Sequence, residues 1–527
     1  MKQEKTLNPI LPSLLTLGLL LLSTTGDILN MLQQPVLAIY VAVILVLIWV
    51  SYYLYNKLII VKYKTKIYSK RDRATPSMKK DIAKFKHIAF IGVSNTSLAT
   101  YLKETIDNNK THLPWETITV LFANEDLGNM WEQNFFEKNI QKSKIKIASL
   151  LFDESYEKLL PNFKTVYFRQ CNTTYNFGGC FCGNTKFDED HFPLQVIYSV
   201  NYLPTDSQTQ NSWTIRVERI GKSSNEKHLF EELEKSFICV RNQADDLGEI
   251  NFSTWEWSSE EWHAFASSYD YFNNGIDAMI SGLDLNGKTV LDIGGGTGNV
   301  ANYLLSKFPY IRLTLLDASA NMLNKAKSLL GEKVDYELIS FPLKMDNFIH
   351  KNRSKYDFII LHLSIQSLVS SKDELRELVD NCFRLLKKEG VVLLAGHNSN
   401  EIRYNFANPD VYIRNDEFRL NIENEIRNKE YVARPCPNTE NSLLENDIIE
   451  AFTKKKNFNL ILTESFDFPF TMPDRKRLWL VPAVLNSKVD VKKIGKVKGR
   501  SIIEKAYHNT KPPTLNRYIK VFHFQKK

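Results

Sequence analysis

Residues 290–298 read Val-Leu-Asp-Ile-Gly-Gly-Gly-Thr-Gly, and they constrain the fold more than any other stretch of the chain. An apolar run that ends in an acid and passes into alternating glycines is typical of a buried strand followed by a tight turn and a helix. Glycine at positions 294, 296 and 298 leaves the backbone free of side chains where a ligand would approach. The helix that follows points its N-terminal N–H groups at that ligand. We therefore expect a parallel α/β domain whose ligand-binding loop covers residues 292–298.

A second acid follows near the distance expected of a nucleoside-binding site. The apolar residues 313–316 predict the next strand, which ends in Asp317, about 25 residues after Asp292. In dinucleotide-binding folds an acid near that spacing binds the ribose hydroxyls. The glycines here follow G-x-G-x-G, whereas the dinucleotide fingerprint is G-x-G-x-x-G. The pattern therefore favours another nucleoside cofactor over NAD, with a dehydrogenase as the less favoured alternative.

The same residues carry a resemblance to a known family. Together with the segments at 356–361, 375–388 and 391–394, they resemble the core of the class I S-adenosylmethionine-dependent methyltransferases, of the type that acts on small molecules. The resemblance implies a Rossmann-like α/β fold with a seven-stranded sheet, whose last two strands fall at residues 458–466 and 517–524. It also implies S-adenosylmethionine as the cofactor. An inactive relative of the family is the alternative.

The resemblance further implies which residues bind the cofactor. In that family the glycine turn holds the methionine end and the acid after the second strand binds the ribose. A residue after the third strand meets the adenine amine, and a short aromatic segment closes over the cofactor. Carried over residue by residue, these roles fall on Asp292, Gly294, Gly296, Gly298, Asp317, Ser340 and Tyr269. Ser340 departs from the pattern, because many relatives carry an acid at that place.

Methyl transfer places few demands on catalytic side chains. The protein has to align the nucleophile with the methyl group and exclude water, and a general base is needed only when the nucleophile arrives protonated. His362, which directly follows the fourth strand, is the first candidate for that base, with a hydrogen-bonded wall residue as the structural alternative. Further candidates near the expected mouth of the site are Gln366, Tyr269, His263 and His397.

The N-terminal end predicts a membrane anchor. Residues 9–25 and 36–55 are uncharged and apolar over about 17 and about 20 residues, lengths that can cross a bilayer. Lysine and arginine crowd the residues after the second stretch, so the positive-inside rule places both ends in the cytoplasm. We therefore expect a transmembrane helical hairpin of two spans within residues 1–56, a basic juxtamembrane linker at residues 57–85, and soluble domains in the cytoplasm. A signal-like first stretch before a single span is the alternative.

A middle α/β domain is expected at residues 86–246. Strand-like runs occupy residues 87–91, 117–122, 144–152, 163–169, 194–202 and 213–220, and a helical pattern covers residues 227–237. The C-x-C spacing of Cys180 and Cys182 is too tight for a zinc knuckle, so we expect no metal. No function is assigned to this domain. The remaining residues, 247–527, form the predicted methyltransferase domain.

These observations converge on methyl transfer as the function. The sequence predicts a transferase that acts on a small-molecule or lipid-like acceptor at the cytoplasmic membrane surface. The alternatives are a protein or peptide methyltransferase and a membrane-tethered sensor that binds the cofactor without turnover. A nucleic-acid substrate is disfavoured, because residues 361–364 read Leu-His-Leu-Ser in place of the N/D-P-P-Y/F motif of the amino-group base methyltransferases. The net charge of +8 lies largely in two lysine-rich runs, at residues 57–86 and 488–500, and so does not require a nucleic-acid partner.

Overall fold

The computed structural model divides the chain into two compact units. The larger unit comprises residues 66–217 and 232–527 and contains the candidate site, and the smaller unit comprises residues 1–65 and 218–231. The described residues are 63–68, 71–92, 98–109, 111–122, 133–171, 177–187, 194–201, 214–219, 226–268, 270–340, 345–369, 371–397, 417–427, 445–454, 457–486, 491–510 and 515–527. In the smaller unit these are residues 63–65, 218–219 and 226–231.

An eight-stranded sheet occupies the first half of the chain, in the order β1-β7-β6-β5-β2-β3-β4-β8. Strands β2, β3 and β4 pair in parallel, and β5 and β8 flank them in the antiparallel direction. Strands β2 and β3 are buried along their whole length, as expected of parallel strands covered on both faces. The bounds are β1 Tyr63–Tyr68, β2 His87–Gly92, β3 Thr117–Phe122, β4 Thr165–Gln170, β5 Phe177–Gly183, β6 Leu194–Asn201, β7 Thr214–Arg219 and β8 Asp245–Asn251.

A seven-stranded sheet occupies the second half, in the order β11-β10-β9-β12-β13-β15-β14. The first five strands are parallel, and β15 runs antiparallel between β13 and β14. This is the Rossmann-like sheet predicted for the C-terminal half, including its last two strands. The bounds are β9 Thr289–Ile293, β10 Arg312–Asp317, β11 Asp335–Leu338, β12 Tyr356–His362, β13 Leu386–His397, β14 Phe458–Phe470 and β15 Leu515–Lys526.

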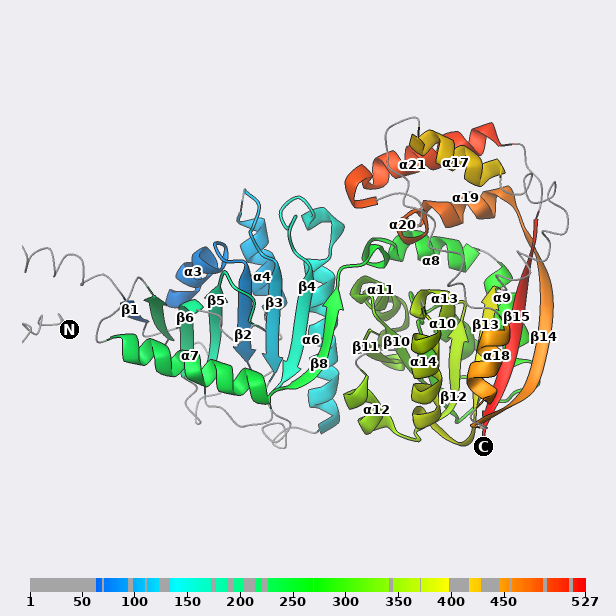
Figure 1. Cartoon of the computed structure of the whole chain (residues 1–527), viewed down its shortest axis with the longest axis horizontal. Helices are drawn as coiled ribbons and strands as arrows, with labels where there is room; N and C mark the ends of the chain where they lie inside the picture. Colours follow the sequence, from blue (N-terminus) through cyan, green and yellow to red (C-terminus); the bar gives the residue numbers. More distant parts are fainter. Residues whose placement is uncertain are drawn as a thin grey trace, which may run out of the picture. The chain divides into compact units, whose positions relative to one another are not determined.

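Helices connect and cover the strands (Figure 1). In α14 the buried residues Leu375, Leu378 and Cys382 recur at helical spacing and pack into the same core as Leu291 of β9 and Leu361 of β12. This burial fixes β9 and β12, whose ends form the site. In the first half the helices are α3 Arg71–Ile82, α4 Leu98–Asp107, α6 Gln133–Leu151, η1 Glu154–Tyr156 and α7 Glu226–Gln243. In the second half they are η3 Thr254–Trp257, α8 Ser259–Ser268, α9 Asp270–Ile280, α10 Asn299–Lys307, α11 Ala320–Leu330, η4 Gly331–Lys333, α12 Asp346–Asn352, α13 Ile365–Leu368, α14 Lys372–Leu385 and α18 Glu445–Thr453.

Four further helices gather beyond α8, at one end of the seven-stranded sheet, and we call them the helical cap (Figure 1). They are α17 Glu417–Arg427, α19 Met472–Leu480, α20 Pro482–Leu485 and α21 Val491–Asn509. The cap has an apolar core of its own, which contains Phe418, Ile422 and Ile502 together with Trp257 of η3. Three of these helices are inserted between β14 and β15, and the two strands still pair with each other. Through Trp257, the cap anchors the short helix η3 that precedes α8.

One of the predicted strands is a helix. Residues 144–152 lie almost entirely in α6, which ends at Leu151. Lys144, Ile147, Ala148 and Leu151 are buried and spaced three and four residues apart, so they share one helix face. Ile145 and Ile147 alternate with lysines, which is the pattern of a half-buried strand. In the structure both isoleucines are buried, but they are buried in a helix. The other strands predicted in this half are confirmed within two residues. The helix predicted at residues 227–237 is also present, but α7 continues beyond it to Gln243.

The predicted transmembrane hairpin and the two-span membrane localisation have to be corrected. Among the described residues, no helix is both long and apolar enough to cross a bilayer. The two predicted spans, residues 9–25 and 36–55, lie outside the described residues. The fold class that remains is α/β with two sheets, the second of them Rossmann-like. The predicted domain boundary after residue 246 falls inside β8, which pairs with β4, and the division into domains stays a prediction.

Candidate functional site

The loop after β9 forms the first wall of a pocket at the carboxyl ends of β9, β10 and β12, and we call residues 294–298 the glycine wall. Gly294, Gly296 and Gly298 have φ angles of 72°, 54° and 80°, a region that residues with a Cβ rarely adopt. A Cβ on Gly294 would lie 2.6 Å from the Cβ of Ser364, and a Cβ on Gly298 would lie 2.8 Å from Leu330 Cδ1. The turn therefore needs glycine both for its backbone shape and for close packing.

Asp292 lies behind this loop, at the end of β9. It is 1% exposed, and its Oδ2 accepts no hydrogen bond from any residue that the structure describes. Burial, together with the nearby charge of Asp317, raises the pKa of Asp292 to about 7. A buried carboxylate oxygen without a partner is energetically costly. It is therefore suited to receive a hydrogen-bond donor or a positive charge from a ligand.

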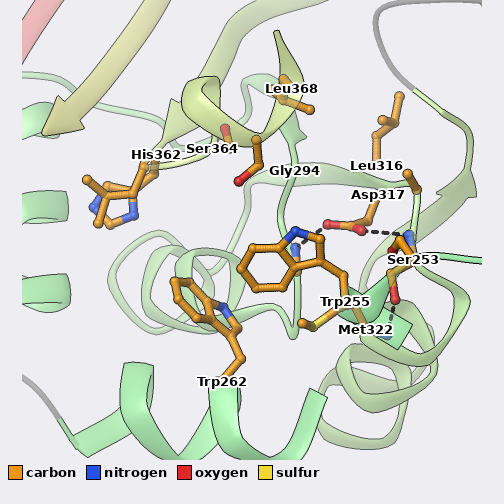
Figure 2. A pocket seen from close by; sticks show the side chains of 15 residues that line it. Ser253, Trp255, Trp262, Gly294, Leu316, Asp317, Met322, His362, Ser364 and Leu368 are labelled. Atoms are coloured by element: carbon orange, nitrogen blue, oxygen red, sulfur yellow. Dashed lines mark hydrogen bonds between the residues drawn. The ribbon is translucent and has the colours of Figure 1, made fainter. Parts of the chain in front are cut away.

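The loop after β10 forms the second wall, residues 316–322, which we call the acid wall (Figure 2). The carboxylate of Asp317 accepts hydrogen bonds from the N–H groups of Gly296 at 2.9 Å and Ser319 at 2.8 Å. Burial raises the pKa of Asp317, and these N–H groups oppose that rise. Ser319 Oγ also accepts from the N–H of Met322 at 3.2 Å and so caps α11. The bond from Gly296 joins the two walls.

Glu256 supports the acid wall from η3. Its carboxylate accepts the N–H groups of Ala320 at 3.0 Å and Asn321 at 2.9 Å, the first two residues of α11. The side-chain amide of Asn321 in turn donates to the carbonyl of Glu256 at 2.9 Å. Glu256 is 2% exposed, and burial raises its pKa to about 7 in spite of these hydrogen bonds. An acid at a helix N-terminus is stabilising, so Glu256 fixes η3 to the start of α11.

Two tryptophans, Trp255 of η3 and Trp262 of α8, give the pocket an aromatic surface (Figure 2). Their rings meet edge to face with centroids 5.5 Å apart. A Cβ on Gly296 would lie 3.4 Å from Trp262 Nε1, so the indole packs directly against the glycine wall. Met322 adds apolar surface on the side of α11. A pocket with aromatic rings next to the Asp317 carboxylate suits a ligand that combines a flat base with a hydroxylated sugar.

His362 ends β12 and lines the pocket from a third strand. It is 7% exposed, and its Nε2 has no hydrogen-bond partner among the described residues. A Cβ on Gly275 would lie 3.2 Å from this nitrogen, and the ring of Phe272 packs against the imidazole with centroids 5.6 Å apart. Burial lowers the pKa of His362 to about 3, so the imidazole is neutral at pH 7. These surroundings favour a wall residue, and a role as general base stays a prediction.

The structure brings most of the predicted residues together. Gly294, Gly296, Asp317 and His362 line one pocket. Asp292 lies in β9 just before the glycine wall, and Gly298 ends that wall at the start of α10. Ser340 is exposed, follows the end of β11 by two residues and is not among the residues that line this pocket. Tyr269 lies outside the described residues, and so do the side chains of Gln366 and His397, whereas His263 lies in α8. The cofactor-binding roles of these residues stay predictions.

Sequence reasoning missed Trp255, Glu256, Trp262 and Ser364. Ser364 Oγ donates to the carbonyl of Ile293 at 2.9 Å, which holds the turn after β12 against the glycine wall. Three of the eight tryptophans in the chain fall at positions 255, 257 and 262, and that density could have indicated an aromatic binding surface. Glu256 carries no such signal, because its partners are backbone N–H groups more than sixty residues away in the sequence.

The residues of this pocket fit S-adenosylmethionine. The glycine wall lets a ligand approach the backbone at three places where a side chain would collide or would have to adopt a strained φ angle. The Asp317 carboxylate lines the pocket, where it can accept ribose hydroxyls, and the buried Oδ2 of Asp292 lacks a partner among the described residues. The tryptophans line the pocket with flat aromatic surface, against which a ring such as adenine can pack.

Fold and site together define a class, the Rossmann-like α/β proteins that bind a nucleoside cofactor at the carboxyl ends of their first strands. Comparison with protein families narrows that class, because a family model described as a methyltransferase domain matches residues 291–392. The C-terminal half of the chain therefore contains a class I S-adenosylmethionine-dependent methyltransferase domain, whose cofactor is S-adenosylmethionine.

Three curated relatives match parts of this region. The ribosomal RNA small subunit methyltransferase C of Buchnera aphidicola is 31% identical over 132 residues, which cover 24% of this chain and 38% of the relative. The malonyl-[acyl-carrier protein] O-methyltransferase of Neorickettsia risticii is 42% identical over 60 residues, covering 10% and 24%. The demethylmenaquinone methyltransferase of Thermotoga maritima is 31% identical over 114 residues, covering 21% and 44%. The chain thus spans less than half the length of each of these relatives.

Among solved structures, the cyclopropane synthase MmaA2 of Mycobacterium tuberculosis aligns with 48% of this chain and 84% of its own, at 16% identity and a TM-score of 0.31.

Proposed function

We propose that the protein transfers a methyl group from S-adenosylmethionine to a small-molecule acceptor. The observation that carries this proposal is the convergence of the glycine wall and the acid wall on one pocket, joined by the 2.9 Å hydrogen bond from Gly296 N–H to Asp317. Two of the relatives are named for methylating a malonyl group on a carrier protein and demethylmenaquinone, and these names support a small acceptor group.

The residues of the pocket bind and orient more than they react. When bound, S-adenosylmethionine supplies an electrophilic methyl group on a sulfonium centre. The Asp317 carboxylate would accept the ribose hydroxyls. Because Gly294, Gly295, Gly296 and Gly298 donate their N–H groups within the protein, the first N–H groups of α10 would face the methionine carboxylate. The rings of Trp255 and Trp262, which line the pocket, would limit the access of water to a bound cofactor. Holding nucleophile and methyl group in line supplies much of the acceleration of such a displacement.

Cofactor binding is the first test. Calorimetric titration of the full-length chain with S-adenosylmethionine should show one site. Asp317→Ala removes the acceptor of two ribose hydroxyl hydrogen bonds, and we expect affinity to fall about a hundredfold, since a hydrogen bond to a charged group contributes about 1.5 to 3 kcal/mol. The matched control is Asp373→Ala, an acid on α14 with 87% side-chain exposure, which should bind like the wild type. Failure of the wild type to bind, or equal binding by Asp317→Ala, would overturn the proposal.

Turnover and acceptor class need a second measurement. The full-length protein is incubated with methyl-labelled cofactor and a cell extract, and the label is then counted in small-molecule, protein and nucleic-acid fractions. We expect label in the small-molecule fraction and an equal amount of S-adenosylhomocysteine. Label in the protein fraction would favour a protein or peptide methyltransferase instead. Binding without formation of S-adenosylhomocysteine would favour a sensor that holds the cofactor without turnover.

A further inference from the structure

Helix α6 connects β3 to β4 of the eight-stranded sheet. It also contacts strand β11 of the seven-stranded sheet and helix α11, which follows β10. Strand β11 lies at the edge of its sheet, so its outward-facing N–H and C=O groups have no neighbouring strand in that sheet. Edge strands are commonly covered by a helix or a loop that satisfies these groups. Here the cover is α6.

Two side chains of α6 pair both backbone groups of one residue at the end of β11. Gln141 Oε1 accepts from the N–H of Leu338 at 3.4 Å, and Lys144 Nζ donates to the carbonyl of Leu338 at 3.0 Å. Lys144 Nζ also donates to the carbonyl of Leu247 in β8 at 2.9 Å. One ammonium group thus joins the last strand of the first sheet to the edge strand of the second.

Lys144 is an unusual residue to place there. It is 1% exposed, and its ammonium group lies over the ring of Phe168 at 5.6 Å from the centroid. Burial lowers the pKa of Lys144 to about 8, while the charges of Glu337 and Asp246 oppose that shift. Burying a lysine is costly unless its donors are satisfied, so a lysine at this place indicates a role beyond filling space.

Ile339, the residue after Leu338, is hydrogen-bonded to the acid wall. The N–H of Ile339 donates to the carbonyl of Asp317 at 3.1 Å, so the turn after β11 lies between Lys144 on one side and Asp317 on the other. Farther along α6, the hydroxyl of Ser149 hydrogen-bonds to the side chain of Asn321, the residue that Glu256 also holds. The acid wall is therefore held by α6 at both of its ends.

We propose that α6 holds the acid wall in the conformation that binds the cofactor, and that Lys144 is the positioning residue in this contact. The inference rests on the proposed function, because it assigns to the first half of the chain a part in S-adenosylmethionine binding. Lys144 does not line the pocket. It acts through Leu338, Ile339 and the carbonyl of Asp317.

The test compares two lysines of the same helix in the full-length protein. Lys144→Met removes both hydrogen bonds and the buried charge, whereas Lys146→Met makes the same change at an exposed position of α6. We expect Lys144→Met to bind S-adenosylmethionine about tenfold more weakly. That factor corresponds to one hydrogen bond to a charged group, because only the bond to Leu338 connects Lys144 to the acid wall. The same factor is expected for 5′-methylthioadenosine, which carries the nucleoside without the amino-acid end. Lys146→Met should bind both ligands like the wild type.

Hydrogen exchange separates positioning from a general loss of stability. In Lys144→Met we expect faster amide exchange at residues 317–322 and 338–340 and unchanged exchange in the glycine wall. Gln141→Ala, which leaves the buried lysine in place, should weaken binding about twofold to threefold and keeps the test open if Lys144→Met does not fold. Unchanged affinity in a folded Lys144→Met with a lowered melting temperature would overturn the inference. Absence of binding by the wild type would instead overturn the proposed function.

Discussion

The two walls of the pocket are built in different ways. The glycine wall is one continuous stretch of five residues, and its shape follows from positive φ angles at three of them. The acid wall depends on residues that are distant in the sequence, namely Glu256 on η3, Ile339 after β11, and Lys144 and Ser149 on α6. We therefore expect substitutions of the glycines themselves to disrupt the glycine wall. The acid wall should instead be disrupted by substitution of any of the distant residues that hydrogen-bond to it.

The largest effect is expected in the glycine wall. Gly294→Ala has to adopt a positive φ angle, which costs about 1 to 2 kcal/mol, and its Cβ would lie 2.6 Å from the Cβ of Ser364. Because the turn then has to move, affinity for S-adenosylmethionine should fall by about a hundredfold or more in calorimetric titration.

Gly331→Ala is the matched control for this change. Gly331 has a φ angle of 62°, and an added Cβ there meets nothing within 4 Å. With ψ at −138° its conformation is one that residues other than glycine almost never adopt, so the variant should lose about 1 to 3 kcal/mol of stability through backbone strain and bind the cofactor like the wild type. Equal loss of affinity in the two variants would show that the effect is not specific to the glycine wall, and it would contradict the prediction.

A smaller effect is expected at a support of the acid wall. Glu256→Ala leaves the N–H groups of Ala320 and Asn321 without their acceptor, and a buried donor left unpaired costs about 1 to 3 kcal/mol. We expect a lower melting temperature and an affinity for S-adenosylmethionine about tenfold weaker. Glu256→Gln keeps one carbonyl acceptor and should lie between the alanine variant and the wild type.

The control for this support is Glu260→Ala on α8. Glu260 has 72% side-chain exposure and forms an ion pair with Lys325 at 2.8 Å, so its loss should change stability by less than about 0.5 kcal/mol. If Glu256→Ala binds the cofactor as well as Glu260→Ala does, the acid wall does not need its support from η3, and the contrast between the walls is lost.

The smallest effect concerns the acid behind the glycine wall. The pKa of Asp292 is raised to about 7 in the folded protein and is near 3.8 when unfolded, so between these values the folded state holds a proton that the unfolded state has lost. The free energy of unfolding should therefore fall as pH rises through this window. Between pH 5 and pH 6 the contribution of Asp292 is about 1 kcal/mol.

Denaturant unfolding of the protein without cofactor measures this slope. In Asp292→Asn the free energy of unfolding should fall by about 1 kcal/mol less between pH 5 and pH 6 than it does in the wild type. Asp373→Asn, at an exposed acid, should leave the wild-type slope unchanged. Parallel slopes for Asp292→Asn and the wild type would mean that Asp292 is ionised in the folded protein and has a partner there.

The fold was predictable where a local pattern had one reading. Strands β9, β10 and β12 are largely buried apolar runs, and each was predicted at its place. The second half of α6 was predicted as a strand, because Ile145 and Ile147 alternate with lysines over a few residues. The adenine contact expected at Ser340 stays a prediction; the residue is exposed and is not among those that line the pocket.

What the sequence determined by itself is the glycine wall and the identity of the two acids, Asp292 and Asp317. Glycine has no Cβ and adopts positive φ angles without strain, and both are properties of the residue itself. A run of alternating glycines can therefore be recognised in the sequence without knowledge of any long-range contact. Only the tertiary structure decided how the acid wall is held. Glu256 and Lys144 bind backbone N–H and C=O groups, which every residue has, and therefore no residue type in the sequence indicates the partner.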